Sequence, residues 1–169
     1  MKTNMHRPKL NINLTKVDYL VEIIGFIGIF CLFFLPTYYY NDLPDRIPMH
    51  FNVLGEADSY GNKLMIWLVP IITLLLYIGM TILNKHPHFF NYPTQVTNEN
   101  AERFYKIATK SIRFLKVLIV VLLFYLNFRI IKIGLDEQAG IGYLFFPIFF
   151  ILIIGLIGGM IYEVMKNKA

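Results

Sequence analysis

Four apolar stretches, separated by polar segments, dominate the pattern of the 169-residue chain. The three clearest contain no charged residue: Ile23–Tyr40, Leu64–Leu83 and Ile141–Tyr162. A fourth, shorter stretch, Val117–Phe128, is bounded by Lys116 and Arg129. A helix needs about 20 apolar residues to cross a hydrocarbon core of about 30 Å. The pattern therefore predicts an all-α membrane protein, built as a four-helix transmembrane bundle within a single membrane domain.

The polar segments predict how the spans are connected. We place the spans at about residues 17–40, 64–83, 112–133 and 141–162, with an outer loop at 41–63 and a cytoplasmic loop and helix at 84–111. In that helix, apolar residues recur at three- and four-residue spacing, which is typical of one apolar face: Ala101, Phe104, Tyr105, Ala108, Ile112 and Leu115. We expect this basic amphipathic helix to lead into the third span, either lying against anionic lipid or projecting beyond it.

Charge predicts the orientation of the spans. With the N-terminus inside, twelve of the 16 Lys and Arg residues fall on the inner side, among them Lys2 and Lys168, and four on the outer side. By the positive-inside rule, both termini face the cytoplasm of a multi-pass protein in the cell membrane. The basic residues flank the apolar runs instead of forming a stripe, so we expect the lipid bilayer and no nucleic acid as a partner.

Several residues within or beside the spans have two readings each. Arg113 and Lys116 are expected to snorkel to one interface, and Arg129 and Lys132 to the other. Glu22 is expected near the cytoplasmic headgroups, with a functional intramembrane role as the alternative. The motif Gly155-x-x-x-Gly159 permits close helix contact, and we expect packing inside the bundle, with a homo-oligomer as the alternative.

The outer loop, Asn41–Lys63, is the segment with the most chemistry, and we expect it to be an ordered cap. Prolines stiffen its first half, apolar and polar residues alternate from Ile47 to Val53 as in an extended strand, and Asp58-Ser-Tyr-Gly is typical of a turn. The candidate ligand-binding or structural residues are Pro44, Asp45, Pro48, His50, Asn52, Gly55, Asp58, Gly61 and Lys63.

These polar groups have three interpretations. They satisfy each other and the loop backbone, they bind a ligand, or His50 with a carboxylate at Asp45, Glu56 or Asp58 supports proton transfer or metal binding. The spacing lacks the fixed pattern of a helical metal motif, and His86-x-His88 has no carboxylate or cysteine nearby. We therefore predict no catalytic residues, no metal and no cofactor, with His50 buried among polar partners.

The run LPDRIPMHFNVLGEADSYGNK, residues 43–63, resembles the signature of a bacterial membrane domain of unknown function, number sixteen-forty-eight. The matching positions are Leu43, Pro44, Asp45, Ile47, Pro48, His50, Phe51, Asn52, Gly55, Asp58, Gly61 and Lys63. With the later stretch TNENAERFYKIATKSIRFLK, the resemblance covers roughly residues 17–130. It implies a multi-span protein similar to the N-terminal part of SdpI-like proteins, which protect the membrane from a secreted peptide toxin and sequester a repressor there.

Three functional hypotheses follow. The first is a non-enzymatic membrane protein of SdpI-like type, related to immunity, that senses or neutralises an envelope-active peptide through the outer loop. The second is a membrane enzyme that acts on a lipid or peptide through His50 with Asp45 or Asp58, and it requires these side chains to converge in a pocket. The third is an accessory subunit whose spans pack against another membrane protein.

Overall fold

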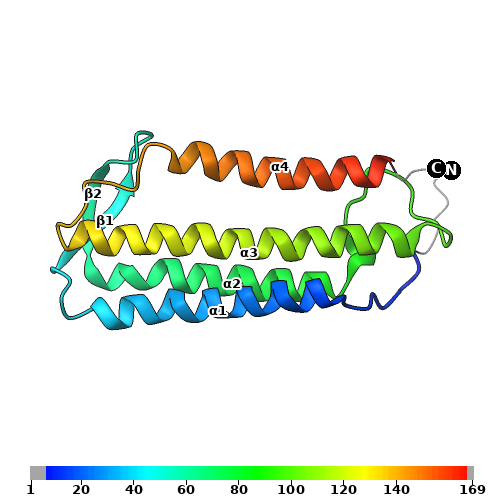
Figure 1. The fold of residues 1–169 in the computed structure, drawn as a ribbon, viewed down its shortest axis with the longest axis horizontal. Helices are drawn as coiled ribbons and strands as arrows, with labels where there is room; N and C mark the ends of the chain where they lie inside the picture. Colours follow the sequence, from blue (N-terminus) through cyan, green and yellow to red (C-terminus); the bar gives the residue numbers. More distant parts are fainter. Residues whose placement is uncertain (1–6, 167–169) are drawn as a thin grey trace.

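The computed structural model of the protein describes residues 7–166 as four long helices and one β-hairpin (Figure 1). The helices and strands are α1 Lys16–Tyr39, β1 Arg46–Phe51, β2 Ala57–Asn62, α2 Leu68–Asn84, α3 Ala101–Gly134 and α4 Phe145–Lys166. Short 3-10 segments at Lys63–Trp67 and Pro87–Phe89 begin and follow α2. All four helices are long and apolar enough to cross a membrane. The predicted helical membrane class is confirmed, with a hairpin added. Lys2 and Lys168 lie outside the described residues.

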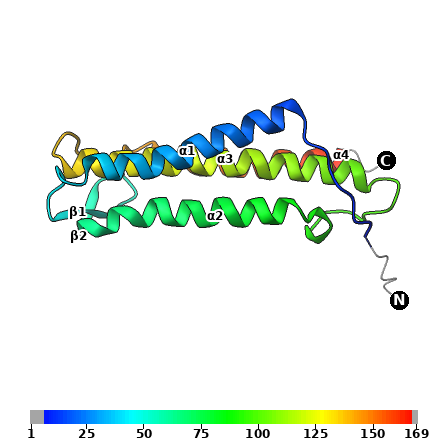
Figure 2. The same cartoon turned by 90° about the horizontal axis from the view of Figure 1, so that it is seen from below.

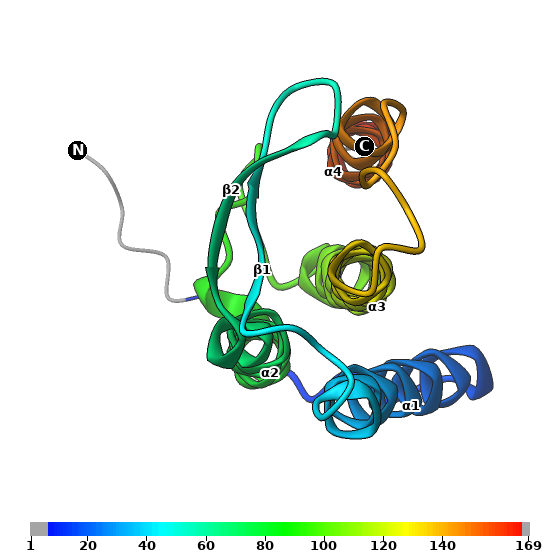
Figure 3. The ribbon, with the colours of Figure 1, turned by 90° about the vertical axis from the view of Figure 1, so that its left-hand side faces the viewer.

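Helix α3 is the centre of the arrangement. It packs against α1, α2 and α4, whereas α1 and α2 contact each other much less. Seen along the helices, the four elements form an open arc, with the hairpin stretching across from α2 towards α4 (Figure 3). Helices α1, α2 and α4 therefore all pack on α3.

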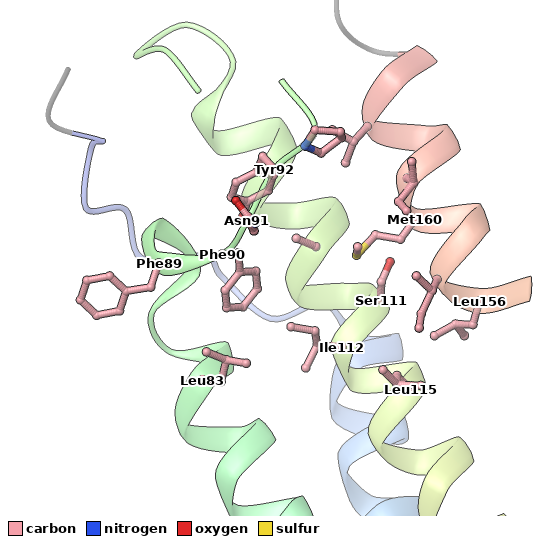
Figure 4. A pocket seen from close by; sticks show the side chains of 15 residues that line it. Leu83, Phe89, Phe90, Asn91, Tyr92, Ser111, Ile112, Leu115, Leu156 and Met160 are labelled. Atoms are coloured by element: carbon pink, nitrogen blue, oxygen red, sulfur yellow. The ribbon is translucent and has the colours of Figure 1, made fainter. Parts of the chain in front are cut away.

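Helix α4 is the least buried of the four. Only 6% of its apolar window is buried inside the protein, so most of its surface is left to contact lipid, where apolar exposure is not penalised. Between α3 and α4 lies an apolar cavity of about 350 Å³, into which Met160 and Leu156 of α4 and Ile112 of α3 project (Figure 4). Packing between these two helices is correspondingly loose.

The expected internal packing of Gly155 and Gly159 is wrong. A Cβ atom added at either residue would meet nothing within 4 Å. Both glycines border open grooves between α3 and α4, Gly155 beside Val117 and Gly159 beside Lys110, without close contact. A role in a homo-oligomer, the alternative reading, stays a prediction.

The amphipathic helix and the third span form one continuous helix, α3. Its 34 residues extend over about 51 Å at 1.5 Å per residue, which exceeds a hydrocarbon core of about 30 Å. The apolar face at Ala101, Phe104 and Tyr105 is fully buried against the protein's own Val96 and Val164. This first part of α3 therefore packs on the chain itself and extends the span.

The two ends of the molecule differ. At one end, called the hairpin end, lie β1, β2 and the α3–α4 connection; at the other, called the loop end, lie the start of α1, residues 84–100 and the end of α4 (Figure 1). The extended segment before α1 crosses the loop end, where Arg7 donates to the carbonyl of Phe90 at 2.6 Å and Tyr105 donates to that of Pro8 at 3.1 Å.

Candidate functional site

The residues predicted as a site lie in and around the antiparallel hairpin at the hairpin end. Strand β1 pairs with β2 from Arg46↔Asn62 to Phe51↔Ala57, and the register is irregular on both sides of His50. Asp58-Ser-Tyr-Gly was expected to be a turn, and this is wrong, because these residues form most of β2. Their strand conformation comes from pairing with β1 and not from their own local preference.

The chain instead reverses direction between Asn52 and Glu56. The side-chain carbonyl of Asn52 accepts hydrogen bonds from the backbone N–H groups of Leu54 and Glu56 at 2.9 and 3.0 Å. Its amide donates to the Glu56 carboxylate at 2.9 Å. Such side-chain bonds to a nearby backbone stabilise turns. Asn52 thus has a structural role at this position.

The inner face of the hairpin is apolar and packs on α3. Leu43 and Ile47 are buried in one cluster with Ile130 and Ile131 of α3, and Met49 and Phe51 pack at its edge. The predicted alternation holds for Ile47, Met49, His50 and Phe51 but not for Pro48, which is buried. It fails at Val53, which lies in the turn with 84% of its surface exposed.

The turn is tied to the α3–α4 connection. The carbonyl of Gly55 accepts a hydrogen bond from Ile141 at 2.8 Å, and Glu56 forms an isolated β-bridge with Gly140. Gly55 has a φ of +80°, and a Cβ here would lie 2.7 Å from the carbonyl oxygen of Gly142. Only glycine satisfies both demands. The hairpin and this connection form one cap.

The base of the cap is closed by Lys63. Its ammonium donates to the carbonyl of Leu43 at 3.3 Å and lies 3.7 Å from the Asp45 carboxylate. Pro48 is buried and Pro44 is exposed in the adjoining chain. Gly61 pairs with Ile47 and leaves room for the Met49 side chain, which a Cβ would approach to 2.7 Å. Apart from the exposed Asp45, these residues shape the cap.

His50 and Asp58 form a pair on the outward side of the hairpin. His50 Nδ1 lies 2.6 Å from Asp58 Oδ1, with side-chain exposures of 71% and 42%. The expectation that His50 is buried is therefore wrong. The register irregularities on either side of it interrupt the alternation of the strand, and such bulges redirect side chains.

The structure brings together part of the proposed catalytic set. Asp58 contacts His50, whereas Asp45 lies at the base beside Lys63. Among the described residues, no three His, Cys, Asp or Glu side chains gather in a way that would hold a metal ion.

A cluster of buried charges at the loop end was missed by the sequence analysis. Lys116 of α3 donates to both oxygens of Glu22 on α1, at 2.9 and 2.7 Å, and to the hydroxyl of Thr81 on α2 at 2.9 Å. Arg113 lies 3.3 Å from Asp18. The expected snorkelling of Arg113 and Lys116 is wrong, since their side chains are only 8% and 1% exposed.

The packing of α1 on α3 explains these contacts. Asp18 and Glu22 are four residues apart on α1, and Arg113 and Lys116 are three apart on α3, so each pair lies on one helix face. The sequence signal that could have predicted this cluster is the presence of opposite charges near the ends of two predicted spans. Tyr77 of α2 completes the cluster by donating to the Glu22 carboxylate at 3.1 Å.

Comparison with known proteins gives a match to one family model and no activity. Residues 27–74 match the family model of a domain of unknown function (DUF1648). An uncharacterized protein of Archaeoglobus fulgidus is 29% identical over 83 residues, which are 44% of this chain and 45% of that protein. The matched region thus spans less than half the length of this relative. No solved structure matches.

The matched segment includes the second half of α1, the whole hairpin and the beginning of α2. It is shorter than the region of roughly residues 17–130 over which the resemblance was expected. It nevertheless contains the motif on which that resemblance was based. Residues 27–74 therefore resemble a DUF1648 domain, and the hairpin described above is the central element of the matched segment.

Proposed function

We propose that this protein is a non-enzymatic, multi-pass membrane protein that binds an envelope-active peptide at its hairpin cap, as expected for an SdpI-like immunity protein. The observation that carries the proposal is the outward face of the cap. It presents an exposed His50–Asp58 pair on a hairpin that is anchored to both α3 and the α3–α4 connection. A binding surface on such a support is already organised before its ligand arrives.

The chemistry of the cap favours a cationic, amphipathic peptide. Residues 41–63 contain four carboxylates, Asp42, Asp45, Glu56 and Asp58, against two cations, Arg46 and Lys63. At the turn, Val53 and Leu54 expose most of their apolar surface next to these charges. A negative surface attracts cationic partners, and exposed apolar side chains beside it can contact the apolar face of such a peptide.

The exposed pair also argues against a purely structural role for His50. Ion pairs between solvent-exposed groups contribute about 0–1 kcal/mol to stability. The cap is held instead by its apolar inner face and by backbone hydrogen bonds. His50 and Asp58 are therefore free to contact a ligand with little consequence for the fold.

The proposal is tested in cells that lack the gene. Loss of the gene should increase sensitivity to cationic envelope-active peptides, and the wild-type gene should restore resistance. His50→Ala and Asp58→Asn should restore it poorly, whereas Glu102→Gln, which changes an exposed carboxylate at the start of α3 outside the cap, serves as the control. Membrane levels of every variant are measured by immunoblot.

A direct binding assay completes the test. The purified protein in lipid nanodiscs should bind a synthetic amphipathic Lys/Leu peptide, and Val53→Ser with Leu54→Ser should weaken that binding. Equal resistance with and without the gene, together with no binding in nanodiscs, would refute the proposal.

A further inference from the structure

A second site lies at the loop end, away from the cap. A cavity of about 580 Å³ opens there between α1, α2 and the extended segment before α1. Figure 2 shows α1 leaning away from α2 towards this end, with the segment before α1 running past the ends of the helices. The cavity has a polar side, which includes Glu22, Arg113 and Lys85, and an apolar side formed by Leu10, Ile12 and Leu14.

The polar side has an excess of positive charge. Its charged lining residues are one carboxylate, Glu22, and two cations, Lys85 and Arg113. Glu22 is engaged by Lys116 through both oxygens. Arg113 has looser contacts, at 3.3 Å to Asp18 and 3.7 Å to Glu22, although its side chain is only 8% exposed. A buried guanidinium held this loosely can bind a further anion with its remaining N–H groups.

The apolar side is held in place and partly exposed. Leu10 and Leu14 each expose 36% of their surface. The segment that carries them is fixed through Arg7, which donates to the carbonyls of His88 and Phe90. The cavity therefore combines one charged wall with one apolar wall.

The depth of the cavity matches a lipid headgroup. Along α1, Glu22 lies about 26 Å from Tyr39 at the hairpin end, counting 1.5 Å per residue. A hydrocarbon core is about 30 Å thick. When the cap lies at one surface of the bilayer, the charged wall lies near the headgroups of the opposite leaflet.

We propose that this cavity binds the headgroup phosphate of a phospholipid. Arg113 and Lys85 contact the phosphate, and Leu10, Ile12 and Leu14 form the opposite wall of the cavity. A guanidinium matches the geometry of a phosphate through paired hydrogen bonds, and basic pockets between membrane helices suit anionic lipid headgroups. This inference does not rest on the peptide-binding function of the cap.

The test uses the purified full-length protein in a nonionic detergent. Phosphatidylglycerol is titrated, binding is followed by native mass spectrometry, and the melting temperature is recorded in parallel. The wild type should bind the lipid and be stabilised by it. Lys85→Gln should bind about tenfold more weakly, as expected for the loss of one charged hydrogen bond. Lys166→Gln, which changes a lysine at the end of α4 outside this cavity, should bind like the wild type.

Two further arms identify the ligand and guard against misfolding. Arg113→Lys keeps the charge beside Asp18 but loses the planar donor group, so it should weaken lipid binding. Lys85→Gln tests the same cavity at an exposed residue that does not take part in the buried ion pairs. Inorganic phosphate, which lacks an acyl chain, should not stabilise the wild type. Equal binding by Lys85→Gln and Lys166→Gln, or equal stabilisation by inorganic phosphate, would overturn the proposal.

Discussion

The ammonium of Lys116 on α3 lies 2.7 Å from a carboxylate oxygen of Glu22 on α1, with only 1% of the lysine side chain exposed. This contact joins two helices at a level where both would otherwise present unpaired charge. Removing one partner of a buried ion pair leaves the other uncompensated, which costs about 3–5 kcal/mol. The pair thus fixes how α1 is aligned on α3.

The first prediction concerns this pair. Lys116→Met should lower the unfolding free energy by about 3 kcal/mol, because the Glu22 carboxylate loses its main partner. The double variant Lys116→Met, Glu22→Leu should recover most of that loss, since no charge remains unpaired. Reversible unfolding in mixed detergent measures both. A single variant as stable as the wild type would show that the pair has no role in holding α1 on α3.

The second prediction concerns the exposed pair of the cap. His50→Ala should change the unfolding free energy by about 0–1 kcal/mol, because 71% of the His50 side chain is in solvent. Peptide resistance should fall in the same variant. Melting temperature and resistance are measured on one preparation and one strain. A large loss of stability would assign His50 to the scaffold of the cap.

The third prediction concerns the turn of the hairpin. Gly55→Ala should destabilise the protein by about 1–3 kcal/mol, because a left-handed φ and the carbonyl of Gly142 both exclude a side chain. Gly79→Ala in α2 is the matched control. A Cβ there meets nothing within 4 Å, so it should be neutral or slightly stabilising. Thermal unfolding of the two variants side by side gives the comparison.

The fourth prediction concerns orientation. Reporter fusions after Ala169 and within residues 84–97 should both be cytoplasmic, because twelve of the 16 Lys and Arg residues then lie inside. A reporter inserted at Leu54 should be external. An external signal from either of the first two fusions would contradict the predicted topology, and peptide binding at the cap depends on that topology.

The fifth prediction concerns α4. Gly155→Leu with Gly159→Leu should leave the thermal stability of the monomer unchanged, since nothing in the described chain lies within 4 Å of the added Cβ atoms. Light scattering of the same variant in detergent reports its oligomeric state. A shift from a larger species to a monomer would assign this face to contact between copies.

Part of this structure follows directly from the sequence. The long apolar runs predict the four helices because hydrocarbon excludes charge, and the alternation from Ile47 to Phe51 predicts β1 because one face of that strand is buried. Strand β2 does not follow, since its polar residues take an extended form only through pairing with β1. How α1 is aligned along α3 decides whether Lys116 is paired with Glu22 or reaches the membrane–water interface. The hydrophobic pattern along the sequence does not specify this alignment.

The hydrogen bond from Ile141 to Gly55 gives the cap a mechanical connection. It joins the turn of the hairpin to the residues immediately before α4, while the base of the hairpin is packed on the far larger surface of α3. The turn that carries Val53 and Leu54 is therefore bonded directly to the chain that leads into α4, the helix least buried inside the protein.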